Sequence, residues 1–152
     1  MRLRVIAVGK DRKRLLFDAA REYSSRVGRY LPFQLVEVAA SRHSRPKEAR
    51  REEASRILSL CGQDKRLFTL EVGGRQMSSE ALANLLGRLM QEGRDVDLVV
   101  GGDEGLDSSL SARAEGALSL GPMTLPHQLA RVVLLEQLYR AMTILRGEPY
   151  HK

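Results

Sequence analysis

The chain has 152 residues, a length that fits one domain with a single hydrophobic core. Hydrophobic residues make up 43% and charged residues 29%, which is typical of a globular protein and excludes a disordered one. No apolar run approaches the roughly 18 residues of a membrane span, and the N-terminal MRLRVIAVGK lacks the features of a secretory signal. The single cysteine, Cys61, cannot form an internal disulfide. We therefore expect a cytoplasmic protein.

Short β-rich runs alternate with longer helical patterns along the chain. The predicted strands are Leu3–Val8, Gln34–Val38, Leu67–Val72, Val96–Val100 and Ala117–Leu120. The predicted helices are Arg14–Val27, Lys47–Leu60, Ser79–Gln91, Ser108–Ala114 and Pro126–Leu145. This alternation predicts one α/β domain over residues 1–152, with a mostly parallel sheet and helices on both of its faces.

The loops that follow the predicted strands are the candidate ligand-binding segments, because ligands of open α/β sheets gather at the carboxyl ends of the strands. Two of these loops carry glycine pairs, Gly73-Gly74 and Gly101-Gly102. Neither pair fits the glycine fingerprints of nicotinamide dinucleotide or P-loop phosphate sites. Asp103 and Glu104 follow the second pair and favour a neutral or cationic ligand over a polyphosphate.

The sequence offers no pattern for a metal site. The three histidines, His43, His127 and His151, show no paired spacing, and Cys61 stands alone. We therefore expect no metal.

One segment is strongly basic. Residues 42–51 contain five Lys or Arg residues and one Glu, and the whole chain has a net charge of +6. Such a cluster can neutralise several phosphates of a polyanion. It is equally well interpreted as a solvated loop and helix start.

The predicted helix Pro126–Leu145 is apolar on nearly every side, although a helix that covers a small sheet needs only one apolar stripe. Its second face is therefore expected to pack against a further surface. A second copy of the helix in a homodimer is the favoured partner, and a neighbouring helix of the same chain is the alternative.

Two groups of polar residues stand out, one in the first turns of this helix and one after its end. His127 and Arg131 lie four residues apart and share a face of its first turns, in a functional or a purely structural role. The final RGEPYHK combines a helix stop, a proline, Tyr150 and His151. A last heptapeptide usually frays, but this one suggests a tail that is docked near a site.

Three stretches carry a family resemblance. VVGGDEGL, LSLGPMTLPHQLARVVLLEQLYRA and the terminal RGEPYHK resemble the SPOUT-superfamily methyltransferases of the bacterial large-subunit ribosomal RNA methyltransferase H family. LRVIAVGK and LFTLEVGGRQMSSEALA also fit, so the resemblance covers the entire chain. It implies a C-terminal trefoil knot, S-adenosylmethionine as cofactor and a homodimer built on the last helix. The implied reaction is methylation of N3 of a pseudouridine in helix 69 of 23S rRNA, on the assembled ribosome.

The resemblance also assigns site residues. The cofactor-binding positions fall on Leu70, Gly101, Leu120, Gly121, Pro122, Met123, Thr124 and Leu125. The candidates for positioning the substrate or removing its proton are His127, Arg131, Tyr150 and His151. Whether the C-terminal tail acts in the site of its own copy or in that of the partner copy stays open. The chain departs from the family pattern at Asp103 and at Gly121-Pro122. Two rivals stay open: a SPOUT methyltransferase that acts on another RNA such as tRNA, and a non-catalytic ribosome-binding factor of the same fold.

Overall fold

The strands form one parallel sheet. The computed structural model describes residues 1–11, 13–62 and 64–152, and within them five strands are arranged in the order β2-β1-β4-β3-β5. Every pairing between neighbouring strands is parallel, which confirms the predicted α/β class. The strands are β1 (Leu3–Val8), β2 (Phe33–Val38), β3 (Arg66–Gln76), β4 (Val96–Val100) and β5 (Gly116–Ser119).

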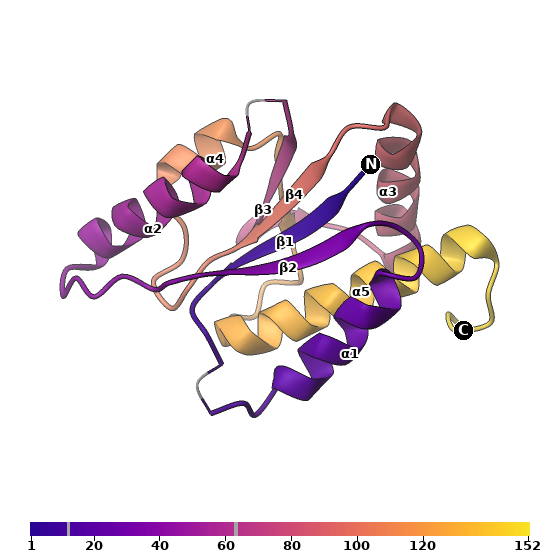
Figure 1. Cartoon of the computed structure of the whole chain (residues 1–152), viewed down its shortest axis with the longest axis horizontal. Coiled ribbons are helices and arrows are strands. Elements are labelled where there is room, and N and C mark those ends of the chain that lie inside the picture. Colours follow the sequence, from indigo (N-terminus) through magenta and orange to yellow (C-terminus); the bar gives the residue numbers. More distant parts are fainter. Residues whose placement is uncertain (12, 63) are drawn as a thin grey trace.

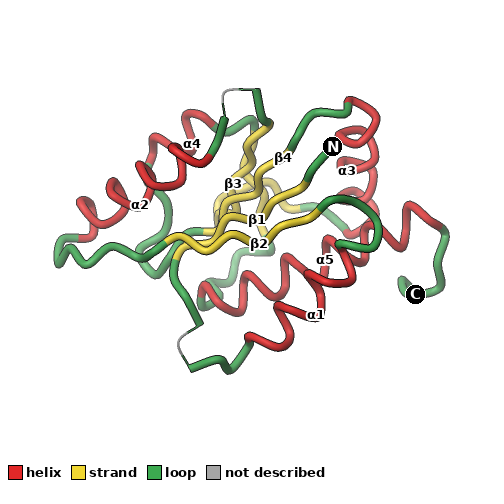
Figure 2. The backbone as a smooth tube through the Cα atoms, viewed as in Figure 1, coloured by secondary structure: helices red, strands yellow, loops and turns green. Residues whose placement is uncertain are grey.

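Helices cover both faces of this sheet, as predicted. Helices α1, α3 and α5 lie on one face, and α2 and α4 lie on the other (Figures 1 and 2). Strand β1 alternates between the two layers, since Val5 packs with the α1/α3/α5 core and Ile6 with the α2/α4 core. The helices are α1 (Phe17–Val27), α2 (Pro46–Leu60), α3 (Ser79–Glu92), α4 (Ser108–Arg113) and α5 (His127–Arg146).

Helix α1 begins three residues later than predicted. Arg14 has a positive φ of 53°, which no helical residue adopts. The Asp11 carboxylate accepts a hydrogen bond from the backbone N–H of Leu16 at 2.7 Å. This local turn holds the chain out of the helix until Phe17.

Strand β3 corrects a second prediction, because Gly73-Gly74 is not a loop. The strand continues to Gln76, and a bulge between Leu70 and Arg75 lets both residues pair with Leu118 of β5. A Cβ atom on Gly74 would lie 2.6 Å from the Leu118 carbonyl group. Glycine is therefore required by the close approach of the two strands.

Helix α5 lies along the sheet between α1 and α3 (Figure 1). Helices α1 and α3 of the same chain therefore cover part of the apolar surface of α5. Leu129 and Leu145 nevertheless stay 37% and 39% exposed, so an uncovered apolar surface remains on this helix. Pro126 is the N-cap and not the first helical residue. In the described residues, no helix has the length and apolar character that a membrane crossing needs.

Candidate functional site

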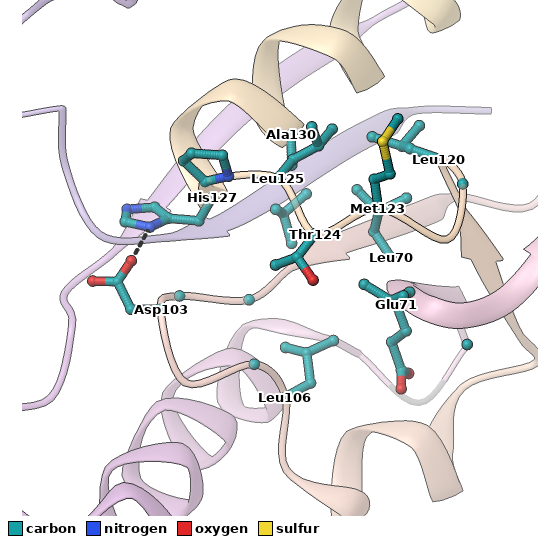
Figure 3. A pocket seen from close by; sticks show the side chains of 18 residues that line it. Leu70, Glu71, Asp103, Leu106, Leu120, Met123, Thr124, Leu125, His127 and Ala130 are labelled. Atoms are coloured by element: carbon teal, nitrogen blue, oxygen red, sulfur yellow. Dashed lines mark hydrogen bonds and ion pairs between the residues drawn. The ribbon is translucent and has the colours of Figure 1, made fainter.

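A pocket of about 660 Å³ opens at the carboxyl ends of β3, β4 and β5, beside the start of α5 (Figure 3). Pro122 does not line it. Seven of the eight predicted cofactor-binding residues do: Leu70, Gly101, Leu120, Gly121, Met123, Thr124 and Leu125. Among the strand-end loops that were candidates from the sequence, those after β4 and β5 line this pocket, together with residues 70–73 of β3.

The loop after β4 forms a tight wall of this pocket. Gly102 and Gly105 make an isolated antiparallel bridge, and Gly105 has a positive φ of 78°. A Cβ atom on Gly101 would lie 3.0 Å from the Gly105 carbonyl group and from the Leu106 side chain. The sequence therefore needs glycine at residue 101 for the loop to fold back on itself.

The charged side chains that line the pocket are acidic. Glu71 accepts hydrogen bonds from the hydroxyl groups of Thr69 at 2.5 Å and Ser111 at 3.0 Å, which fix its carboxylate. Asp103 lies at the other side of the pocket (Figure 3). Over residues 1–11, 13–62 and 64–152, no Lys or Arg lines the pocket. Its electrostatics therefore favour a ligand with positive charge.

His127 is held at the mouth of the pocket by two polar contacts. Its Nδ1 lies 2.6 Å from a carboxylate oxygen of Asp103, as the dashed line in Figure 3 marks. Its Nε2 lies 3.1 Å from the amide nitrogen of Gln128. One tautomer satisfies both contacts: Nδ1–H donates to Asp103, and Nε2 accepts from Gln128. Gly9 lies behind the ring, since a Cβ atom there would be 3.4 Å from Nε2.

Arg131 lies behind the pocket wall and does not line the pocket. It is 2% exposed, and its Nη2 donates to the backbone carbonyl oxygens of Gly9 at 2.8 Å and Val8 at 3.4 Å. Burial lowers the pKa of its guanidinium from the ordinary value, while the charges of Glu37 and Asp11 oppose this effect. The residue therefore fixes the end of β1 next to His127.

The C-terminal tail is docked, as the sequence suggested, but on the side of α5. The Tyr150 ring packs edge-on against Tyr139 at 4.6 Å, and its hydroxyl donates to Glu136 at 3.1 Å. Burial, together with hydrogen bonds, raises the pKa of Tyr150. His151 Nε2 lies 2.7 Å from a carboxylate oxygen of Glu80 in α3.

The four predicted catalytic candidates therefore fall into two groups within one chain. Glu136, which Tyr150 contacts, follows His127 by nine residues of α5. At 1.5 Å per residue this separation is about 14 Å along the helix axis. Of the four candidates, His127 alone lines the pocket.

Two features of the site were missed by sequence reasoning. Glu71 lines the pocket from within β3, and its position next to the predicted Leu70 was the available signal. The contact between Asp103 and His127 spans 24 positions, and no local pattern announces it. In the described part of the chain, no group of three or more His, Cys, Asp or Glu side chains is arranged to hold a metal ion.

Comparisons with known proteins agree with this geometry. Residues 1–151 match the family model described as "Predicted SPOUT methyltransferase". Two proteins named ribosomal RNA large subunit methyltransferase H, from Anaeromyxobacter sp. (strain Fw109-5) and Ectopseudomonas mendocina, are 52% and 42% identical to this chain. Both alignments cover 100% of this chain and of the relative.

Two solved structures share the fold. One is a probable methyltransferase from Bordetella pertussis, with a TM-score of 0.59, 16% identity, and coverage of 93% of this chain and 94% of that chain. The other is a probable methylase family protein from Haemophilus influenzae, with a TM-score of 0.58, 14% identity, and coverage of 99% and 70%. On its full-length match and its identity to these relatives, the chain belongs to the SPOUT methyltransferases of the ribosomal RNA large subunit methyltransferase H family.

Proposed function

We propose that this protein is an S-adenosylmethionine-dependent methyltransferase that methylates N3 of a pseudouridine in helix 69 of 23S rRNA, on the assembled ribosome in the cytoplasm. The observation that carries the proposal is the acidic, glycine-walled pocket at the carboxyl edge, which gathers seven residues that the family resemblance assigns to the cofactor.

The pocket residues fit this cofactor chemically. S-adenosylmethionine supplies a methyl group activated by a positively charged sulfonium, and it also carries an ammonium group. Glu71 and Asp103 give the pocket the opposite charge. Leu70, Leu106 and Leu125 provide apolar walls that suit an adenine ring. The backbone of Gly101 can lie directly against the ligand because it has no side chain.

His127 is the residue that we assign to the acceptor side of the reaction. A pseudouridine N3–H must lose its proton for N3 to accept a methyl group. The Asp103 carboxylate accepts the Nδ1–H hydrogen bond, so the Nε2 lone pair of the imidazole is the one that takes the N3 proton, once the substrate replaces the Gln128 amide as its partner. Arg131 acts through position, since it fixes the Gly9 backbone behind His127.

We further propose a homodimer in which the tail of one copy completes the site of the other. The exposed part of α5 around Leu129 supplies an apolar contact surface. Consider two α5 helices that pack antiparallel, with their crossing point at Val132 and Val133. In this pair, Gln137 of one copy lies at the same height along the helix axis as Gln128 of the other copy. Tyr150 and His151 are docked near the Gln137 level, so each tail would meet the partner's pocket.

The C-terminal trefoil knot belongs to the same proposal. Three segments that are distant in the chain wrap one pocket, namely residues 70–73, 100–106 and 120–127. In a knotted chain the last segment passes through a loop formed by the earlier ones, which fixes all three walls together.

The decisive experiment compares methyl transfer from labelled S-adenosylmethionine to intact ribosomes and to naked 23S rRNA, with mass mapping of the modified nucleotide. We expect modification of one pseudouridine in helix 69, on ribosomes. A His127→Gln variant should lose transfer and keep cofactor affinity in calorimetry, because Gln cannot act as a base. A label that maps to tRNA would instead support the alternative substrate. A folded dimer that binds no S-adenosylmethionine would support the non-catalytic ribosome-binding factor.

Light scattering tests the dimer. We expect twice the chain mass, and a Leu129→Arg variant should dissociate into monomers that bind cofactor but transfer no methyl group. A monomeric wild-type protein with full activity would exclude a composite site.

A further inference from the structure

The carboxyl edge of the sheet is divided into two halves of different character. The pocket lies over β4, β3 and β5 and is acidic. The other half consists of the loops after β1 and β2, which leave the sheet side by side because the Gly9 N–H donates to the Val38 carbonyl oxygen at 2.8 Å. Both loops, and the start of α2, lie toward the left and lower left in Figure 1.

This second half carries a group of exposed cations, which we call the basic rim. Glu48 and Glu52 do not neutralise it, because they pair with Arg45 and Arg56. In the part of the chain that the structure describes, no ion pair engages any member of the rim. The members are Lys10 and Lys13 after β1, Arg42 after β2, and Lys47 and Arg51 in α2.

Helix α2 connects the basic rim to the loop that walls the pocket. Arg50, between two rim positions on α2, donates from Nη1 to the backbone carbonyl oxygen of Glu104 at 3.4 Å. Glu104 lies within the loop that walls the pocket, between Asp103 and Gly105. The positive charges of Arg51 and Arg50 also contribute to a lowered pKa at Asp107, after hydrogen bonds from Ser109 as the main cause. The α2 cations thus stand at one side of the pocket mouth.

We propose that the basic rim binds the sugar-phosphate backbone of the RNA that flanks the target nucleotide, so that a polyanion lies over β1 and β2 while the methyl donor lies over β4, β3 and β5. This inference rests on the proposed function and assigns a surface to its substrate. The boundary between the halves is where β1 neighbours β4, and His127 stands there against Gly9. A nucleotide held at that boundary faces the imidazole from one side and the pocket from the other.

The division also explains how one small protein serves two oppositely charged ligands. Phosphates are attracted by the rim and repelled by Glu71 and Asp103, so the RNA backbone stays out of the pocket. The cationic donor has the opposite preference. Each cation that neutralises a phosphate of single-stranded RNA contributes a slope of about 0.7 to the dependence of log affinity on log salt concentration.

The test removes two rim charges from α2 in the full-length protein. The rim variant is Lys47→Gln/Arg51→Gln. The matched control, Arg29→Gln/Arg88→Gln, removes two exposed charges that are not part of the rim. Arg29 lies in the loop before β2, and Arg88 lies in α3. For each protein we would measure the KM for ribosomes across salt concentrations, the kcat, and the cofactor Kd by calorimetry. Filter binding of a helix 69 RNA would be measured in parallel.

For the rim variant we expect a KM about 10-fold higher, weaker RNA binding, and a salt slope smaller by about 1.4, the sum of two phosphate contacts. Its kcat and cofactor Kd should match wild type, and the control should match wild type throughout. Equal RNA affinity and equal salt slope in the rim variant and the control would overturn the proposal. Filter binding measures RNA affinity even if no methyl group is transferred, so failure of the proposed function is recognised separately.

Discussion

Replacing Gly74 by alanine should destabilise the sheet where β3 and β5 meet. The added Cβ would lie 2.6 Å from the carbonyl carbon and oxygen of Leu118, and 2.9 Å from the carbonyl carbon of Ala117. Carbon atoms in contact normally stand about 3.5–4.0 Å apart. The two backbones must therefore separate by about 1 Å, and no side-chain rotation can relieve the overlap.

Overpacking of this kind costs about 1–3 kcal/mol. For a domain of this size, each kcal/mol lowers Tm by about 2–4 °C, so Gly74→Ala should lower Tm by roughly 2–12 °C in a thermal melt followed by circular dichroism. Gly73→Ala is the matched control, because a Cβ atom there meets nothing within 4 Å. It should leave Tm unchanged or raise it slightly, since alanine restricts the unfolded chain more than glycine.

The difference in Tm between the Gly74→Ala and Gly73→Ala variants tests the close contact between β3 and β5. If Gly74→Ala and Gly73→Ala melted at the same temperature, the close contact between β3 and β5 would not constrain residue 74. A second readout is the cofactor Kd. Residues 70–73 line the pocket, so a displaced bulge in the Gly74 variant should also weaken binding.

Three further predictions concern ionisable groups. Arg4→Ala should cost about 3 kcal/mol in urea denaturation, because the fully buried Asp97 loses the guanidinium that contacts it twice at 2.6 Å. Burial raises the pKa of the Cys61 thiol to about 12, so alkylation at pH 8 should be slow in the folded protein and fast in urea. Backbone and Ser78 hydrogen bonds, with one from His151, lower the pKa of Glu80 from its ordinary 4.5 to about 2. Its stabilisation is therefore present above pH 4.5 and lost as the pH falls toward 2, and Glu80→Gln should flatten this part of a stability-against-pH curve.

The strands β1 and β4 were predicted with their observed bounds because they are short apolar runs that end in glycine. Strand β3 was predicted too short because a glycine pair usually marks a turn, whereas here Gly74 marks a close approach of two backbones. This difference depends on β5, a strand over 40 residues later in the sequence. Local patterns therefore determined the elements, and tertiary contacts decided where one of them ended.

The candidate site divides in the same way. Positions after strand ends converged as predicted, because parallel strands bring their carboxyl ends to one edge. The four-residue spacing of His127 and Arg131 predicted that both share one face of the helix, yet it could not tell which one lines the pocket. Which of the two side chains lines the pocket depends on the backbone carbonyl oxygens at the end of β1. The buried guanidinium of Arg131 donates hydrogen bonds to these oxygens and is therefore held away from the pocket. An arginine with so little exposure needs such acceptors, and its role follows from them.

The length of α5 decides how the tail can serve the pocket. The helix is anchored by fully buried residues such as Leu135 and Leu138, so its two ends cannot approach each other. Within one chain, Tyr150 could reach His127 only by leaving Tyr139 and Glu136, and those contacts would then be lost without replacement. In an antiparallel dimer the tail would keep its docked position against α5, and the pocket of the partner copy would lie next to it. The second arrangement keeps every contact of the tail and adds burial of the exposed Leu129, and for this reason we favour a site shared between two copies.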